Sequence, residues 1–264
     1  MVFARAGPDD DSRGMTTSTT DTTAPGVLTG KNALVTGASR GIGRAAALAL
    51  GRSGARVAVN YVRNREAARE VTDQLHDAVA LQGDALDAAG VRTLFAAADE
   101  LLGGLDVVVL NAAAPSFGPL VDATDSDIEQ ALAGTVRAAA VALQEAGRRV
   151  RDEGRILVIS SGAVRSPGPG AGLYGAGKTA VDHLAAVLAT ELGHRGVTVN
   201  SLAPGVTDTD GLVIPEEQVR AMVSATPLGR LGRPEDIGDL VALVASPQAR
   251  WLTGQLIGAG GGLV

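Results

Sequence analysis

A glycine-rich turn between a short apolar segment and an alanine-rich helical segment constrains this sequence most. Residues 33–36 (ALVT) suit a buried strand, residues 37–43 read GASRGIG, and helical spacing follows at 45–50. Glycines at a strand-to-helix turn allow a tight turn, close approach of the backbone to a pyrophosphate, and close packing of helix on strand. The turn therefore predicts a nucleotide-binding site made by Gly37, Ser39, Arg40, Gly41, Ile42 and Gly43.

The rest of the chain alternates short apolar runs with segments of helical spacing, which is typical of a parallel sheet covered on both faces. We predict one α/β domain over residues 30–264, with a doubly wound (Rossmann) seven-stranded parallel sheet. The strands are expected at 33–36, 56–60, 78–82, 106–110, 155–160, 197–201 and 255–259. The helices are expected at 45–50, 66–75, 91–102, 126–150 and 174–192. Ligands of such a sheet bind beyond the carboxyl ends of the strands.

The first 29 residues are rich in Asp, Ser and Thr and contain no apolar block that resembles a signal peptide. We expect a disordered tail there, with Met15 as a second candidate for the first residue of the protein. The formal net charge of -6 gives no broad basic field for nucleic acid. No later segment has the ~18 consecutive apolar residues that a membrane span needs. A cytoplasmic protein that binds neither nucleic acid nor membrane is expected.

Metal and thiol chemistry find no support in the sequence. The chain has no cysteine, which excludes disulfides, thiolate metal sites and a cysteine nucleophile. The histidines, His76, His183 and His194, lack the spacing of metal ligands. We therefore expect a site without a metal ion.

The end of the second predicted strand distinguishes NADP from NAD. Folds that prefer NAD place an acidic residue about 20 positions after the glycine turn. This chain has Asn60 there, which we expect to face the cofactor, and Arg40, Arg63 and Arg65 supply cations for a 2'-phosphate. NADPH is therefore the expected cofactor, with Asp84 accepting a hydrogen bond from the adenine. A solvated helix start is the alternative for Arg63 and Arg65, and a solvated turn for Asp84.

The glycine turn also fits the G-x-S-x-G pattern of a hydrolase nucleophile elbow, with Ser39 as nucleophile. That elbow would lie on the first strand, and no histidine follows His194 to act as a late triad base. The hydrolase and a turn of purely structural role remain alternatives to the nucleotide site.

Tyr174 and Lys178 lie four residues apart, so a helix places both on one face. The chain has only two tyrosines and two lysines, which makes this spacing uncommon by chance. Reduction of a ketone needs a proton for the developing alkoxide, and a phenol with a pKa near ~10 matches neutral pH poorly. A neighbouring ammonium group and an oxidised nicotinamide are expected to lower that pKa. The pair predicts a carbonyl reductase with Tyr174 as the proton donor.

Ser161 follows the fifth predicted strand and is separated from Tyr174 by a loop rich in glycine and proline. Its hydroxyl is suitably placed to hold the carbonyl oxygen of the substrate. Serines after strands are also common turn residues, so only the pairing with Tyr174 favours a catalytic role.

Four motifs together resemble the short-chain dehydrogenase/reductase family over nearly all of residues 31–264. They are TGASRGIG at 36–43, Ser161 with Tyr174 and Lys178, NSLAPG at 200–205, and TGQ at 253–255. The resemblance implies that Tyr174 is the acid, that Ser161 orients the carbonyl, and that Lys178 also binds the nicotinamide ribose. It further implies a homotetramer, and cofactor contacts from Asn111, Pro204 and Thr207, with Thr207 at the nicotinamide amide.

Two positions depart from the family pattern. The family has Asn-Asn-Ala-Gly after the fourth strand, whereas this chain has Leu110-Asn111-Ala112-Ala113, which places a methyl group near the cofactor. A helix-borne asparagine that anchors a proton-relay water in the family is replaced by Thr135. Since a hydroxyl can also hold a water, hydride transfer should survive while proton resupply slows.

The segment 206–223 follows the sixth strand and is expected to cover the site with apolar side chains: Leu212, Val213, Ile214, Met222 and Val223. These side chains favour an apolar ketone, with ordinary core packing as the alternative. A composition rich in Ala, Arg and Gly and poor in Lys resembles actinomycete tailoring reductases that act on aromatic polyketides.

Two other functions stay open at this stage. The family resemblance extends to 3-oxoacyl-carrier-protein reductases, for which an acidic carrier would dock on Arg148, Arg149, Arg151 and Arg195. Charge compensation at a helix end is the alternative for these arginines. Thr135 also suggests a protein that senses nucleotide without catalysis.

Overall fold

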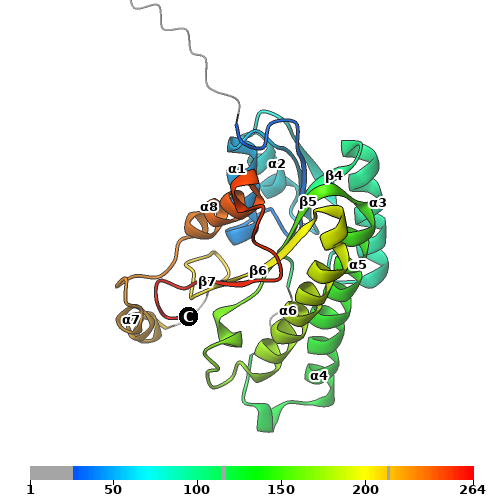
Figure 1. Cartoon of the computed structure of the whole chain (residues 1–264). Coiled ribbons are helices and arrows are strands. Elements are labelled where there is room, and N and C mark those ends of the chain that lie inside the picture. The colour runs from blue at the N-terminus through cyan, green and yellow to red at the C-terminus, as the bar shows by residue number, and fades with distance from the viewer. Residues whose placement is uncertain (1–25, 114–116, 213–214) are drawn as a thin grey trace, which may run out of the picture.

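The computed structural model describes residues 26–113, 117–212 and 215–264. Within them, seven parallel strands form one sheet in the order β3-β2-β1-β4-β5-β6-β7 (Figure 1). The order reverses between β1 and β4, so the predicted doubly wound seven-stranded sheet is confirmed. The strands are β1 (Asn32–Val35), β2 (Arg56–Tyr61), β3 (Ala78–Gln82), β4 (Leu105–Leu110), β5 (Val150–Ile159), β6 (Thr198–Pro204) and β7 (Leu256–Ala259).

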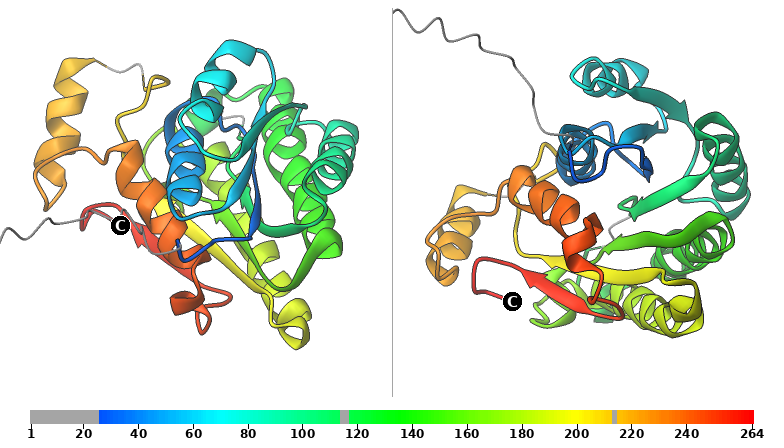
Figure 2. Two further views of the ribbon diagram at one scale, coloured as in Figure 1. Left: turned by 90° about the horizontal axis from the view of Figure 1, so that it is seen from above. Right: turned by 45° about the horizontal axis from the view of Figure 1, so that its top comes forward.

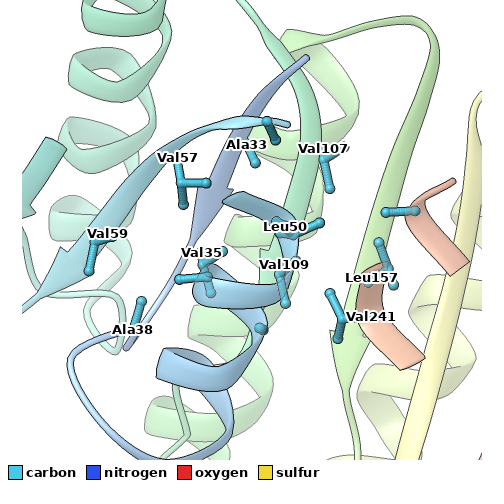
Figure 3. Close-up of a cluster of buried hydrophobic side chains, with 14 of the residues drawn as sticks. Ala33, Val35, Ala38, Leu50, Val57, Val59, Val107, Val109, Leu157 and Val241 are labelled. Carbon is cyan, nitrogen blue, oxygen red and sulfur yellow. The ribbon is translucent and has the colours of Figure 1, made fainter. Parts of the chain in front are cut away.

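Helices cover both faces of the sheet (Figure 2). One face carries α1 (Gly41–Arg52), α2 (Arg65–Thr72) and α8 (Pro234–Ala245). The other carries α3 (Ala88–Leu102), α5 (Ala138–Arg149) and α6 (Gly172–Leu192). Strand side chains alternate between the two cores, so Val107 and Val109 meet the first set of helices and Val108 the second. Figure 3 shows the first core, where Leu50 of α1 and Val241 of α8 lie over strand valines.

The long helix predicted at 126–150 is interrupted in the structure. It divides into α4 (Asp125–Ala131), a π-helical segment η2 (Leu132–Arg137) and α5, and Val150 already begins β5. Periodicity alone did not reveal the wider turn, because it covers only six residues within a segment that is otherwise helical. Short π-helical segments often occur at functional sites, and this one contains Thr135.

Two helices at the carboxyl side of the chain escaped sequence prediction, namely α7 (Glu216–Ala225) and α8. α7 lies in the segment that we expected to cover the site, and none of its described side chains is buried. None of the helices in the described residues is both long and apolar enough to cross a membrane.

The predicted disordered tail is too long at its end. Leu28 is buried and its N–H donates to Ser53 O at 2.8 Å, so residues 26–29 pack on the domain. The Leu28 side chain joins the first core and its backbone binds the end of the following helix α1, which explains the difference. The remainder of the predicted tail, with Met15, lies outside the described residues.

Candidate active site

The glycine turn has the geometry that a bound phosphate requires. Gly37 and Gly41 have φ values of +61° and +55°, in the left-handed region that favours glycine. A Cβ on Gly43 would lie 2.4 Å from Gly37 O, so the helix passes too close to the strand for any side chain. Within the described residues no side chain caps α1, and its first turn has no acidic residue. The N–H groups at the N-terminus of α1 are therefore left for an anion.

Asn60 has a different position from the one expected. Its side chain is fully buried; Oδ1 accepts from Gly37 N at 2.9 Å, and Nδ2 donates to Gly83 O at 3.0 Å and Leu81 O at 3.2 Å. Every polar atom of the amide thus binds backbone. Asn60 fixes the glycine turn to the end of β3, and the prediction that it faces the cofactor is wrong.

Asn111 fixes the same turn from the opposite side. Its Nδ2 donates to Thr36 O at 3.0 Å and Gly37 O at 3.1 Å. The hydroxyl of Thr36 accepts from Asn111 N at 2.9 Å and Ala112 N at 3.1 Å. The ends of β1 and β4 are therefore joined at the point where the strand order reverses, which is where open α/β sheets bind their ligands.

Cations surround the turn. Arg40, Arg63 and Arg65 are exposed, and none of them pairs with a carboxylate in the described part of the chain. Asp84 is also exposed, and its Oδ1 accepts from Leu86 N at 2.8 Å. The glycine turn, the uncapped helix and the unpaired arginines together fit a dinucleotide that carries an additional 2'-phosphate.

Ser161, Tyr174 and Lys178 come together at the carboxyl end of β5. Ser161 begins a short 3₁₀ turn, and its Oγ accepts from Ala163 N at 3.2 Å. Tyr174 lies in the first turn of α6, and Lys178 follows on the same face with Nζ 5.9 Å from the centre of the tyrosine ring. Lys178 Nζ donates to Ile159 O at 2.6 Å, which ties the helix to the end of the strand.

Burial dominates the acid-base properties of the pair. It raises the pKa of Tyr174 above its usual value, and the hydroxyl of Ser161 partly opposes this shift. Burial also lowers the pKa of Lys178 to about 8, against the attraction of the Asp182 carboxylate. The protein's own groups do not produce the expected lowering of the Tyr174 pKa, because burial outweighs the hydrogen bond with Ser161. At neutral pH the phenol holds its proton.

Asp182 is a site residue that the sequence analysis missed. Its Oδ2 accepts a hydrogen bond from Ser160 Oγ at 2.6 Å, and Ser160 directly precedes Ser161 in the chain. Burial raises the pKa of Asp182, and the hydrogen bond from Ser160 opposes this. Asp182 follows Lys178 by four residues, as Lys178 follows Tyr174, so the repeated spacing was the available signal. Its carboxylate supplies the counter-charge behind the buried ammonium.

Thr135 of η2 lies against α6 behind Lys178. It is buried, and a Cβ on Gly177 would lie 3.1 Å from Thr135 Cγ2. A cavity of about 20 Å³ is lined by Thr36, Thr135 and Lys178 among apolar side chains. This volume is enough for one water molecule with polar partners. The structure thus places Thr135 and Lys178, the two residues expected to take part in the proton relay, around one cavity.

Pro204 and Thr207 reach the same edge of the sheet from β6. Thr207 is buried and its Oγ1 donates to Gly205 O at 3.0 Å. Met222 and Val223 of α7 are half-buried, as is Leu212. Val213 and Ile214, the other predicted apolar cover residues, lie outside the described residues.

The arginines considered for carrier docking lie at the opposite edge of the sheet. Arg149 pairs with Glu145 at 3.0 Å and Asp99 at 3.2 Å, and the other three are each within 3.5 Å of a carboxylate. All four flank the beginning of β5 or β6, so they are at the amino ends of the strands. The geometry favours the alternative of charge compensation for Arg148, Arg149, Arg151 and Arg195, because each has a carboxylate partner and all four lie at the ends of the strands opposite to Tyr174. Docking of a carrier there stays a prediction.

Known proteins show the same chain organisation. A family model described as "Enoyl-(Acyl carrier protein) reductase" matches residues 37–264. Versicolorin reductase stcU of Emericella nidulans is 38% identical over 253 residues, which cover 89% of this chain and 96% of that protein.

Solved structures agree with that match. The angucycline C-6 ketoreductase LanV with bound NADP is 38% identical, with a TM-score of 0.84 over 90% of this chain and 97% of that one. A short chain dehydrogenase of Burkholderia cenocepacia in complex with NADP is 39% identical, with a TM-score of 0.85 over 89% and 98%.

Proposed function

The chain belongs to the short-chain dehydrogenase/reductase family, and on that premise we propose that it reduces a secondary-metabolite ketone to a secondary alcohol with NADPH. The observation that carries the proposal is the meeting of Tyr174, Lys178 and Ser161 beside the glycine turn. A proton donor, a buried cation and a hydroxyl are what reduction of a carbonyl requires from the protein.

NADPH supplies the hydride when it is bound. Because the glycine turn and α1 leave backbone N–H groups for an anion, they would hold its pyrophosphate. The 2'-phosphate would lie by the exposed arginines, and the nicotinamide end by the carboxyl ends of β4 and β6. The residues proposed to hold it are Gly37, Ser39, Arg40, Gly41, Ile42, Gly43, Arg63, Asp84, Asn111, Pro204, Thr207, Tyr174 and Lys178.

Tyr174 donates the proton in this mechanism. Its raised pKa keeps the phenol protonated at neutral pH, which is the form that reduction consumes. Ser161 holds the carbonyl oxygen close to the phenol, so that charge developing on that oxygen meets two hydroxyl donors. Lys178 then stabilises the phenolate left behind, because it is buried beside the ring.

Proton resupply is assigned to Lys178 and Thr135. The cavity that they share has room for one water, which would connect the ammonium group to the hydroxyl of Thr135. The wide π-helical turn brings the threonine to this position.

Replacing Thr135 with valine is expected to lower kcat by about threefold to tenfold, since the shape is kept and the hydroxyl is lost. Thr135→Asn, the matched variant that can hold a water, is expected to equal or exceed the original turnover. Both are measured as NADPH oxidation in H₂O and D₂O. A large solvent isotope effect combined with a silent Thr135→Val would show that the relay does not pass through this residue.

The 2'-phosphate preference gives a second prediction. NADPH is expected to bind at least tenfold more tightly than NADH, a difference of about 1.4 kcal/mol. Arg40→Ala should weaken NADPH binding by about tenfold and leave NADH binding nearly unchanged, because only the phosphate contact is lost. Titration calorimetry with both nucleotides measures this, with the exposed Arg69→Ala of α2 as the control variant. An equal loss for both nucleotides would mean that Arg40 only shapes the turn.

The substrate class follows from the relatives and from the entrance of the site. Versicolorin reductase and the angucycline ketoreductase are named for polycyclic aromatic compounds. Apart from Lys178 and Ser161, the contact that the structure gives to Tyr174 is apolar, namely the exposed ring of Phe117. An apolar, aromatic polyketide-like ketone therefore suits this site better than an acidic carrier protein, because the arginines considered for docking are already paired.

NADPH oxidation with purified protein tests the function directly. Aryl and bicyclic ketones are expected to be reduced, and a 3-oxoacyl thioester much more slowly. If the thioester were the better substrate by tenfold or more, the enzyme would be a fatty-acid reductase. If neither class were reduced while NADPH bound tightly, the nucleotide-sensing alternative would replace this proposal.

A homotetramer is part of the proposal. Leu132 at the end of α4, and Leu184 and Val187 of α6, are large apolar side chains that stay exposed in one chain. Light scattering at micromolar concentration is expected to give about four times the chain mass of 26.5 kDa. A monomer under those conditions would refute the homotetramer.

The cytoplasmic location expected from the sequence also stays a prediction.

A further inference from the structure

Phe117 lies against the ring of Tyr174 but is mostly open to solvent. The two ring centres are 5.1 Å apart with an angle of 49° between the ring planes, a tilted geometry that aromatic pairs favour. The residue is nevertheless 70% exposed, so one part of the ring contacts Tyr174 and most of its surface stays open to solvent. A large apolar surface of this kind beside a reacting group is a candidate for substrate contact.

The segment that carries Phe117 is fixed relative to the catalytic helix. The adjacent Gly118 N donates to Gly170 O at 2.8 Å, two residues before α6 begins. A Cβ on Gly172 would lie 3.7 Å from the Leu120 side chain, so the two segments stay in contact along the entrance. The backbone thus holds Phe117 beside Tyr174.

The use of an aromatic residue at this place stands out in this chain. Phe, Tyr and Trp make up only 2% of the sequence. In the described residues, Phe95 and Tyr61 are core residues, and Trp251 precedes β7 at the amino ends of the strands. Among the residues that the structure describes, Phe117 and Tyr174 are therefore the aromatic side chains that lie at the edge of the sheet where the active site is.

We propose that Phe117 is a specificity-determining residue that selects an aromatic ring fused to the ring that bears the reacting ketone. The inference rests on the proposed function, since it places the carbonyl oxygen at the hydroxyl of Tyr174. The fused ring beyond the carbonyl then lies over the ring edge of Tyr174, where it meets the open part of Phe117. An aromatic ring there gains a second tilted or offset contact, which a saturated ring of equal size cannot make.

Two alcohols with the same bicyclic skeleton test this directly. 2-Hydroxytetralin has an aromatic distal ring and 2-decalol a saturated one, and both resemble the product of reduction. We expect the NADPH-loaded protein, which cannot oxidise the alcohol, to bind 2-hydroxytetralin about fivefold to tenfold more tightly than 2-decalol, as measured by calorimetry. Phe117→Leu should reduce this ratio to within twofold of one, whereas Phe117→Tyr, which keeps the ring, should preserve it.

Leu120→Ala is the matched control, because it removes another exposed apolar side chain of the same segment. It is expected to leave the binding ratio unchanged. The proposal is overturned if Phe117→Leu weakens both alcohols equally, or if the original protein does not discriminate between them. Turnover of 2-tetralone is measured separately: its absence would count against the proposed function, while the binding ratio still decides the role of Phe117.

Discussion

Replacing Tyr174 with phenylalanine is expected to lower kcat by about 10³-fold while the dissociation constant of NADPH changes by less than about twofold. The ring keeps its contact with Phe117, and only the hydroxyl is lost. A proton donor at the reacting atom acts mainly in the transition state, so its removal affects turnover rather than cofactor binding. Steady-state oxidation of NADPH and calorimetric titration measure the two effects separately.

Tyr61 offers a control with the same chemical change. It is the other tyrosine in the chain, and it is buried at the end of β2 in the core. Tyr61→Phe is expected to leave both kcat and NADPH binding nearly unaltered. If the Tyr174 variant kept more than a tenth of the turnover, another group would have to be the proton donor.

Replacing Lys178 with methionine is expected to lower kcat/KM by at least 10²-fold and yet to stabilise the folded protein at pH 7. Burial lowers the pKa of this lysine from 10.5 to about 8, which corresponds to a cost of roughly 3 kcal/mol for keeping it charged. Loss of the hydrogen bond to Ile159 O offsets about 1 kcal/mol of the gain. Loss of the attraction between Lys178 and the Asp182 carboxylate offsets a further part of the gain. The net increase in the free energy of unfolding is therefore expected to be only about 1 kcal/mol.

The pH dependence of the stability difference between Lys178→Met and the original protein shows whether burial of the lysine charge causes it. Since the pKa is lower in the folded than in the unfolded state, the unfolded chain binds more protons between pH 8 and 10.5. The free-energy cost of burying the charged Lys178 is complete below about pH 8. This cost decreases as the pH rises through this window, and it vanishes above 10.5. The original protein should therefore gain stability relative to Lys178→Met over the same range. Denaturant unfolding of both proteins at pH 7, 9 and 10.5 measures it.

Lys31→Met serves as the control, because Lys31 is the other lysine and is half-exposed in an ion pair with Asp106. Asp106 is buried but keeps its ion pair with Arg151 at 3.3 Å when Lys31 is replaced, and Lys31 carries no burial penalty of its own, so no stabilisation is expected. A stability difference between Lys178→Met and the original protein that stays constant from pH 7 to 10.5 would contradict the burial explanation.

Local patterns in the sequence were sufficient for the sheet and for the central part of the site. Each strand is a compact apolar run, and the glycines of the turn and the Tyr174–Lys178 pair have fixed spacings that survive any packing detail. Such features depend on neighbours within one element. They were therefore visible before any tertiary contact was known.

Features that depend on contacts between elements were not predictable. The inward orientation of Asn60 requires the ends of β2 and β3 to lie beside the glycine turn. The paired arginines needed partners such as Asp99 from another helix. The sign of the Tyr174 pKa shift depends on how deeply the ring is buried, which no spacing rule contains.

Asn60 and Asn111 both hold the glycine turn in place, so the shape of the turn does not depend on the residues that supply the charge around it. The shape of the turn is set by the amides of Asn60 in β2 and of Asn111 directly after β4, whereas the charge around it comes from the exposed Arg40 and Arg63. A heptapeptide GASRGIG transplanted alone would lack the side chains that shape it. Exchanging the surface arginines, in contrast, leaves these supports untouched, so nucleotide preference can be redesigned, or can drift in evolution, without endangering the fold.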